Sequence, residues 1–104
     1  MKRLLLALLA ALAFPTAVNA ESANDYFLKF NKAQSLLIKG DFSNAEKICD
    51  EMIETSPEKK WGYLCKASSL IISGKQKKRE ALKNLTKAIE IDPEFYDAYF
   101  LRGV

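Results

Sequence analysis

The chain has 104 residues, with 16 Lys and Arg, 13 Asp and Glu, two Cys and no His. This length allows one small domain. The lack of His excludes catalytic triads built on His, His general bases and zinc sites that need an imidazole ligand. We therefore expect a protein that is not an enzyme and that holds neither a metal ion nor a cofactor.

The first twenty residues have the layout of a secretory signal peptide. Lys2 and Arg3 give a positive start, residues 4–14 are an unbroken apolar run, and Val18 and Ala20 stand before a cleavage point after Ala20. The apolar run is too short to cross a bilayer, which needs about 20 residues. A cleaved export signal is therefore favoured over a membrane anchor. We expect the mature chain to reach a periplasm, a lumen or the extracellular medium, with no stable membrane span.

The remaining residues, 21–104, form a nearly neutral chain, because Lys2 and Arg3 supply two of the three net positive charges. A near-neutral chain gives no electrostatic reason to expect nucleic acid as a partner. A chain of this size also buries a small core. We expect its stability to depend on repeats, a disulfide or a partner.

An internal repeat covers most of these residues. The segment 32–40, KAQSLLIKG, aligns with 66–74, KASSLIISG, at an offset of 34. The second halves align at an offset of 36 through the pairs Ala45 and Ala81, Ile53 and Ile89, and Pro57 and Pro93. The two extra residues lie between Gly74 and Ala81, and an insertion in a turn there leaves the flanking elements in register.

Apolar residues recur at spacings of three and four in both units, which is the period of an amphipathic helix. Gly40 and Gly74 stand where a helix ends and the backbone needs a positive φ. The pairs Ser56-Pro57 and Asp92-Pro93 are typical of an N-cap followed by Pro at the first helical position. The pattern predicts an all-α chain with helices over residues 24–39, 43–55, 57–73, 77–91 and 93–104.

These features resemble the tetratricopeptide repeat (TPR) proteins, whose unit is a helix-turn-helix of 34 residues. Counted from Tyr26, the small, turn and proline positions of the family pattern are occupied by Ala33, Gly40, Ala45 and Pro57. Lys29 and Met52 depart from that pattern in the first unit. The resemblance implies a short solenoid of stacked antiparallel hairpins, with repeats at about 26–59 and 60–95 and a partial repeat at 96–104.

The resemblance also implies a binding surface, because TPR arrays generally bind peptides or protein segments on the concave face formed by the first helix of each hairpin. The positions assigned to that face are Phe27, Phe30, Gln34, Leu37, Ile38, Trp61, Leu64, Ser68, Ile71 and Ile72. The face is mostly apolar and lacks the Lys and Asn groups of carboxylate-clamp members. We expect an extended apolar segment or an amphipathic helix as its ligand, and the alternative is that several of these residues are ordinary core.

Two functions fit this pattern. The favoured one is an exported interaction module or scaffold that binds a protein or peptide partner. The alternative is a small-molecule-binding or enzyme-like helical protein that uses the same groove, which polar groups converging beside the apolar wall would favour.

The two cysteines, Cys49 and Cys65, lie on helices that are neighbours in the predicted order. Export places them where disulfides persist. A disulfide requires Cα atoms within about 7 Å, and free Cys is also a common small core residue. The sequence leaves both states open.

The last predicted helix carries many apolar side chains, namely Phe95, Tyr96, Tyr99, Phe100, Leu101 and Val104. Either it caps the second repeat, or its apolar surface docks another chain, a second copy included, or a longer array was truncated. The basic run Lys75, Lys77, Lys78 and Arg79 is expected to be a solvated loop, with contact to an acidic partner or an anionic membrane surface as the alternative. The acids Glu46, Asp50, Glu51 and Glu54 are expected to form a polar helix face.

Overall fold

The computed structural model describes residues 22–74 and 76–103, and the signal-like segment 1–20 lies outside them. The described residues are helical and contain no strand. The helices are α2 (Ala23–Lys39), α3 (Phe42–Thr55), α4 (Lys60–Ile72), α5 (Lys78–Ile91) and α6 (Tyr96–Arg102). The predicted all-α architecture is confirmed. Within the described ranges no helix combines the length and the apolar character that a membrane span requires.

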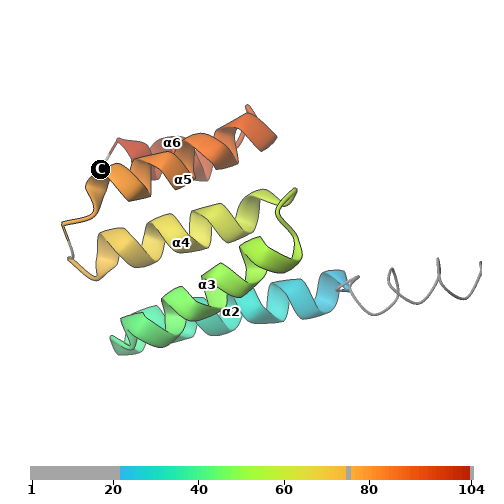
Figure 1. Cartoon of the computed structure of the whole chain (residues 1–104), viewed down its shortest axis with the longest axis vertical. Helices are drawn as coiled ribbons and strands as arrows, with labels where there is room; N and C mark the ends of the chain where they lie inside the picture. Colours follow the sequence, from blue (N-terminus) through green and yellow to red (C-terminus); the bar gives the residue numbers. More distant parts are fainter. Residues whose placement is uncertain (1–21, 75, 104) are drawn as a thin grey trace, which may run out of the picture.

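The helices form a stack of antiparallel hairpins (Figure 1). α2 and α3 form the first hairpin, α4 and α5 form the second, and α6 packs on the second. α4 lies between α3 and α5 and also contacts α2 and α6. Every residue from 62 to 70 is consequently buried, so the centre of the molecule is a single helix that both hairpins share.

Small residues let these helices approach closely. The four Ala residues at matching repeat positions, Ala33, Ala45, Ala67 and Ala81, are at most 2% exposed. Leu70 and Leu85 fill the layer between α4 and α5 and are fully buried. Of the last apolar residues, Phe95 is buried against this core, whereas Tyr96 and Phe100 are exposed. Val104 lies outside the described residues.

The turn inside each hairpin uses glycine as predicted. Gly40 has φ 84° and Gly74 has φ 69°, which is the left-handed region where a side chain would be strained. After α2, the Asp41 N–H donates to the Leu36 carbonyl at 2.8 Å and the Gly40 N–H donates to the Leu37 carbonyl at 3.1 Å. These bonds satisfy carbonyls that the end of the helix leaves without partners.

The turns between hairpins differ from the prediction that Ser56 and Asp92 cap the next helices. Instead, Ser56–Lys59 and Asp92–Phe95 form tight turns, in which the N–H of the fourth residue donates to the carbonyl of the first at 3.1 and 3.0 Å. α4 and α6 begin one residue after these turns. The fixed φ of proline suits the second position of a turn as well as the first position of a helix, which is why the prediction was wrong.

A tyrosine anchors each of these turns in the same way. The Tyr63 hydroxyl donates to the Pro57 carbonyl at 2.7 Å, and the Tyr99 hydroxyl donates to the Pro93 carbonyl at 3.0 Å. The two tyrosines are related by the offset of 36. The repeat is therefore preserved in the hydrogen bonds of the turns as well as in the helices.

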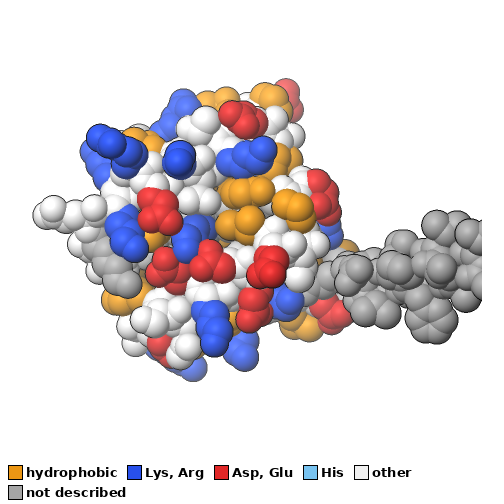
Figure 2. Space-filling view, in the orientation of Figure 1, with side chains coloured by type: hydrophobic (Ala, Val, Ile, Leu, Met, Phe, Trp, Pro, Cys, Tyr) orange, Lys and Arg blue, Asp and Glu red, His pale blue; other side chains and the backbone are white. Residues whose placement is uncertain are grey.

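Charges are distributed unequally between the two outer helices. Figure 2 shows Asp and Glu side chains gathered over α3 and Lys and Arg side chains gathered over α5. Lys77 and Lys78, at the start of α5, are exposed, whereas Lys75 lies outside the described residues. The two helices occupy equivalent places in the stack but present opposite charge.

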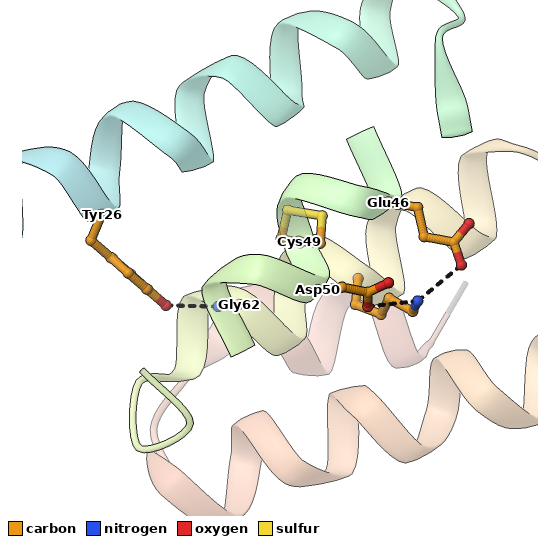
Figure 3. The surroundings of a disulfide bond; sticks show 7 residues. Tyr26, Glu46, Cys49, Asp50 and Gly62 are labelled. Carbon is orange, nitrogen blue, oxygen red and sulfur yellow. Dashed lines mark hydrogen bonds and ion pairs between the residues drawn. A yellow bond between two sulfur atoms is a disulfide. The ribbon is translucent and has the colours of Figure 1, made fainter. Parts of the chain in front are cut away.

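The junction between the two hairpins is covalent (Figure 3). A disulfide joins Cys49 of α3 to Cys65 of α4, with Cα atoms 5.4 Å apart. Both cysteines are at most 1% exposed and belong to a buried cluster with Tyr26, Ala33 and Met52. Of the two states that the sequence left open, the structure has the bonded one.

An ionic group lies beside the disulfide, because Asp50 and Lys66 directly follow Cys49 and Cys65 in the chain (Figure 3). Lys66 of α4 is 2.9 Å from Glu46 and 2.8 Å from Asp50, both of α3. Burial acts to lower the pKa of Lys66, but hydrogen bonds and attraction from the two carboxylates outweigh that effect and raise it from its ordinary 10.5. Two of the acids predicted to form a polar helix face are thus partners of a buried cation.

A third contact at this junction closes the start of α4. The first N–H groups of a helix have no partner within the helix. The Gly62 N–H, in the first turn of α4, donates to the buried hydroxyl of Tyr26 at 2.8 Å (Figure 3). Tyr26 of the first hairpin therefore takes the capping role that the sequence analysis assigned to Ser56.

Candidate functional site

The first helices of successive hairpins form a groove, which we call the inner groove. Its lining residues are Phe30 and Gln34 of α2, Trp61, Leu64 and Ser68 of α4, and Asp97, Phe100 and Leu101 of α6. Its volume is about 320 Å³. The groove is thus built by the two helices that the sequence analysis assigned to a concave face, α2 and α4, together with α6.

The internal repeat explains how the inner groove is assembled. Phe30, Leu64 and Phe100 are related by the repeat offsets, so each of the three helices contributes one large apolar side chain at the same position. Gln34 and Ser68 are related in the same way. Equivalent positions of stacked helices face the same side of a solenoid, so that their side chains form a continuous wall.

Trp61 is the centre of an aromatic cluster beside the inner groove. Its ring lies edge-to-face with Phe27 at 6.1 Å, with Phe30 at 5.4 Å and with Phe95 at 5.0 Å between centroids. Such pairs stabilise by about 0.5–1.5 kcal/mol beyond the area that they bury. The cluster links α2, α4 and the turn before α6, and it fixes Trp61 in a half-buried position.

An ion pair closes one side of this cluster. Lys60 is paired with Asp92, and its ammonium group lies 4.5 Å from the centroid of Phe95 and 5.5 Å from that of Trp61. The hydrogen bond from Lys60 holds the pKa of Asp92 below its ordinary value. A second hollow, which shares Trp61 with the inner groove, is lined by Phe27 and by this pair.

Half of the predicted binding residues line the inner groove. They are Phe30, Gln34, Trp61, Leu64 and Ser68. Leu64 and Ser68 are only 5% and 7% exposed, because α4 is covered on several sides, so they present a small part of their surface to a ligand. Phe30 and Trp61 are half-buried and present more.

The other predicted binding residues lie elsewhere. Leu37 is 5% exposed and belongs to the core, which is the alternative that the sequence analysis left open for several of these residues. Ile38 and Ile72 are 87% and 54% exposed but do not line the inner groove. Phe27 and Ile71 line other hollows. These positions lie on other parts of the surface because the apolar stripe of each helix is wider than the side that lines the inner groove.

The sequence analysis missed the residues that α6 supplies. Asp97, Phe100 and Leu101 line the inner groove, and Phe100 is 74% exposed. The signal was present, because an offset of 36 carries Trp61 to Asp97 and Leu64 to Phe100. Extending the repeat to the last helix would have found them.

The polar groups of the inner groove come from all three helices, as Gln34, Ser68 and Asp97. An amide, a hydroxyl and a carboxylate can hydrogen-bond the backbone or a cation of a bound segment. Among the described residues no group of His, Cys, Asp and Glu is arranged to hold a metal ion. The arrangement is suited to binding, with aromatic anchors beside a few polar contacts.

The fold and the repeated groove define a short TPR-type solenoid, with two hairpins and the first helix of a third. No protein-family model and no curated protein matches the chain. One solved structure does, the "TPR2AB-domain:pHSP90-complex of yeast Sti1", with a TM-score of 0.70 and 28% sequence identity. The match covers 89% of this chain and 36% of the yeast chain, so this chain spans about a third of the length of the chain that it resembles.

Proposed function

We propose that this protein is an exported interaction module that binds an apolar segment of a partner protein in the inner groove. The observation that carries the proposal is the repeated contribution of Phe30, Leu64 and Phe100 by three successive first helices. The matched yeast structure is a complex of the same type of fold with pHSP90, which supports a protein rather than a nucleic acid as the partner.

The lining of the inner groove suggests the chemistry of the bound segment. Aromatic and aliphatic side chains would anchor its apolar residues, and Gln34 and Ser68 would bond its backbone. Asp97 is the charged group among the described lining residues. A Lys or Arg in the segment would therefore be favoured beside α6, and an acid there would be disfavoured.

Two independent features support export. The segment 1–20 has the layout of a cleaved signal. The pairing of Cys49 with Cys65 suits an oxidising compartment, where disulfides persist. Mass spectrometry of the protein from its native compartment should find a mature chain that begins at Glu21. A stable form that keeps residues 4–14 would contradict this part of the proposal.

The binding site is tested by affinity capture from the native compartment with two matched variants of α6. Phe100→Ala removes an exposed aromatic group of the inner groove, and Tyr96→Ala removes one of similar exposure, 77%, that does not line it. Truncating an aromatic anchor commonly costs about 2 kcal/mol, or about thirtyfold in affinity. The genuine partner should be lost with Phe100→Ala and kept with Tyr96→Ala.

The double variant Phe30→Ala with Trp61→Ala gives a stronger loss, because it removes the anchors of two helices. Its circular dichroism must match the wild type, since Trp61 also joins the aromatic cluster. Retained capture by a folded double variant would refute the groove as the binding site.

A small molecule is the second candidate ligand, and the convergence of Gln34, Ser68 and Asp97 beside the apolar wall favours it. Native mass spectrometry of the purified protein distinguishes the two. A bound mass of a few hundred daltons that disappears in Phe100→Ala would support the small molecule. An empty groove that binds the captured partner would support the interaction module.

A further inference from the structure

Another groove lies along the first half of α5, the second helix of the second hairpin, and we call it the α5 groove. Leu70, Ile71, Leu82 and Leu101 contribute to its apolar floor, and Lys77, Lys78 and Arg102 stand around it. Its volume is about 210 Å³. Ile71, Leu82 and Leu101 are only half-buried, so the floor has apolar surface left for another chain.

The internal repeat shows what covers the equivalent surface in the first hairpin. The counterparts of Ile71, Ala81 and Leu85 are Leu37, Ala45 and Cys49, which are at most 5% exposed. α4 packs there, in contact with both α2 and α3. In the second hairpin the counterpart of α4 is α6, which covers part of this surface with Leu101 and Arg102 and leaves Ile71 and Leu82 half-buried.

The charge around the two surfaces differs, because Leu82 and Thr86 stand on α5 at the positions of Glu46 and Asp50, and Arg102 stands on α6 at the position of Lys66. In the first hairpin, Glu46 and Asp50 of α3 form ion pairs with Lys66 of α4, the helix that covers the surface. In the second hairpin the described lining residues of the α5 groove include Lys77, Lys78 and Arg102 and no acid. Figure 2 shows the same contrast on the surface, with basic side chains over α5 and acidic ones over α3. A helix complementary to the α5 groove would carry acids.

We propose that the α5 groove binds an amphipathic helix of a partner protein, with apolar residues on its floor and acidic residues along Lys77, Lys78 and Arg102. This site adjoins the inner groove at Leu101, but its basic residues do not line the inner groove. The basic run that the sequence placed in an inserted turn would then recognise an acidic partner instead of being only solvated.

The test uses the full chain and two synthetic helical peptides of about 11 residues, or three turns. Both carry Leu along one face, and their polar positions are Glu in one peptide and Lys in the other. Fluorescence anisotropy should show binding of the Glu peptide and at least about tenfold weaker binding of the Lys peptide. Added salt should weaken the binding of the Glu peptide, because it screens the charges around the groove.

Two charge-reversal variants locate the site. Lys77→Glu with Lys78→Glu should weaken the Glu peptide by at least about tenfold. The matched control, Lys83→Glu with Lys87→Glu, makes the same change of net charge on α5 at residues outside the groove, and it should change the affinity less than about twofold. Failure of the Glu peptide to bind, or equal loss in both variants, would overturn the proposal.

Two other occupants have distinct outcomes. A concentration-dependent dimer in sedimentation, abolished by Lys77→Glu with Lys78→Glu while neither peptide binds, would replace the foreign helix by a second copy of this chain. Binding to phosphatidylserine vesicles that needs the same two lysines, again without peptide binding, would replace it by a membrane. Neither outcome depends on Phe100, so partner binding in the inner groove is tested separately by the Phe100→Ala variant.

Discussion

Two junctions in the stack have the same backbone design but different chemistry. The first junction joins α3 to α4, and the second joins α5 to α6. At the first junction, Cys49 and Cys65 form a disulfide. At the second, the equivalent positions, 36 residues later, are occupied by Leu85 and Leu101. At the first, Lys66 pairs with two acids. At the second, the equivalent positions are Arg102, Leu82 and Thr86. The turns and their tyrosine bonds are nevertheless the same.

This difference separates what the architecture needs from what a particular junction adds. Small residues, a proline turn and its tyrosine recur, so they are requirements of the stack. The disulfide and the ionic group occur at one junction, where they hold the first hairpin against α4. The first junction should therefore respond to redox state and to high pH through these two features, which the equivalent positions of the second junction lack.

The largest effect should come from breaking the disulfide. The double variant Cys49→Ala with Cys65→Ala should lose about 3 kcal/mol, because a bond across a separation of 16 residues no longer restricts the unfolded chain. Urea unfolding with and without reductant measures the loss. Reductant should destabilise the wild type by a similar amount and leave the double variant unchanged. If the urea midpoint of the wild type did not change with reductant, the first junction would not need its covalent bond.

A smaller loss should follow Gly62→Ala. A Cβ at Gly62 would lie 3.0 Å from a side-chain carbon of Ile53 and 3.2 Å from its backbone N, so Ile53 of α3 would have to shift by a few tenths of an ångström. Overpacking typically costs about 1–3 kcal/mol, and the better helix propensity of Ala returns about 1 kcal/mol. We expect a net loss of about 1 kcal/mol in thermal unfolding.

The second junction provides the matched position for this test. Ala98 is the counterpart of Gly62 and is fully buried with its methyl group in place. Ala98→Gly should also destabilise, through lost packing and helix propensity. If Gly62→Ala instead stabilised the protein while Ala98→Gly destabilised it, the close approach of the helices would not be particular to the first junction.

These comparisons also show how far the sequence could predict the fold. The helices and glycine turns were predictable because they follow from local periodicity and backbone conformation, as at Gly40 and Gly74. The start of α4 was not, because its cap is the hydroxyl of Tyr26, which is distant in sequence. The ionic group of Lys66 was missed for the same reason, since acids on one helix look solvated until a neighbour packs against them.

The candidate site was predictable in part. Repeat positions placed Phe30, Trp61 and Leu64 on the right helices. Which apolar residues of a helix are core and which line the groove depends on how the helices rotate against each other, as the burial of Leu37 shows. Whether Cys49 and Cys65 can bond also depends on that rotation, which local sequence does not specify.

The ionic group gives the first junction an alkaline dependence. The pKa of Lys66 is raised above its ordinary 10.5, so its stabilisation is complete below that pH and is lost as pH rises through the higher pKa of the folded state. Lys66→Arg, which matches Arg102 at the second junction, keeps its charge. We expect the wild type to lose about 1 kcal/mol or less relative to this variant above pH 10.5. Urea unfolding near neutral pH and above pH 10.5 measures the difference, and parallel pH profiles would contradict it.

The last effect, a gain in stability, concerns α4, the helix that both hairpins share. The hydroxyl of Ser69 is 1% exposed and, within the part of the chain that the structure describes, has no hydrogen-bond partner. Ser69→Ala should therefore stabilise by about 1 kcal/mol, because a buried polar group without a partner is removed and Ala is the better helix former. Ser35, its counterpart on α2, is exposed, so Ser35→Ala gains the helix propensity alone. The difference between the two thermal midpoints isolates the cost of the buried hydroxyl, and equal shifts would show that Ser69 bonds to a water inside the stack.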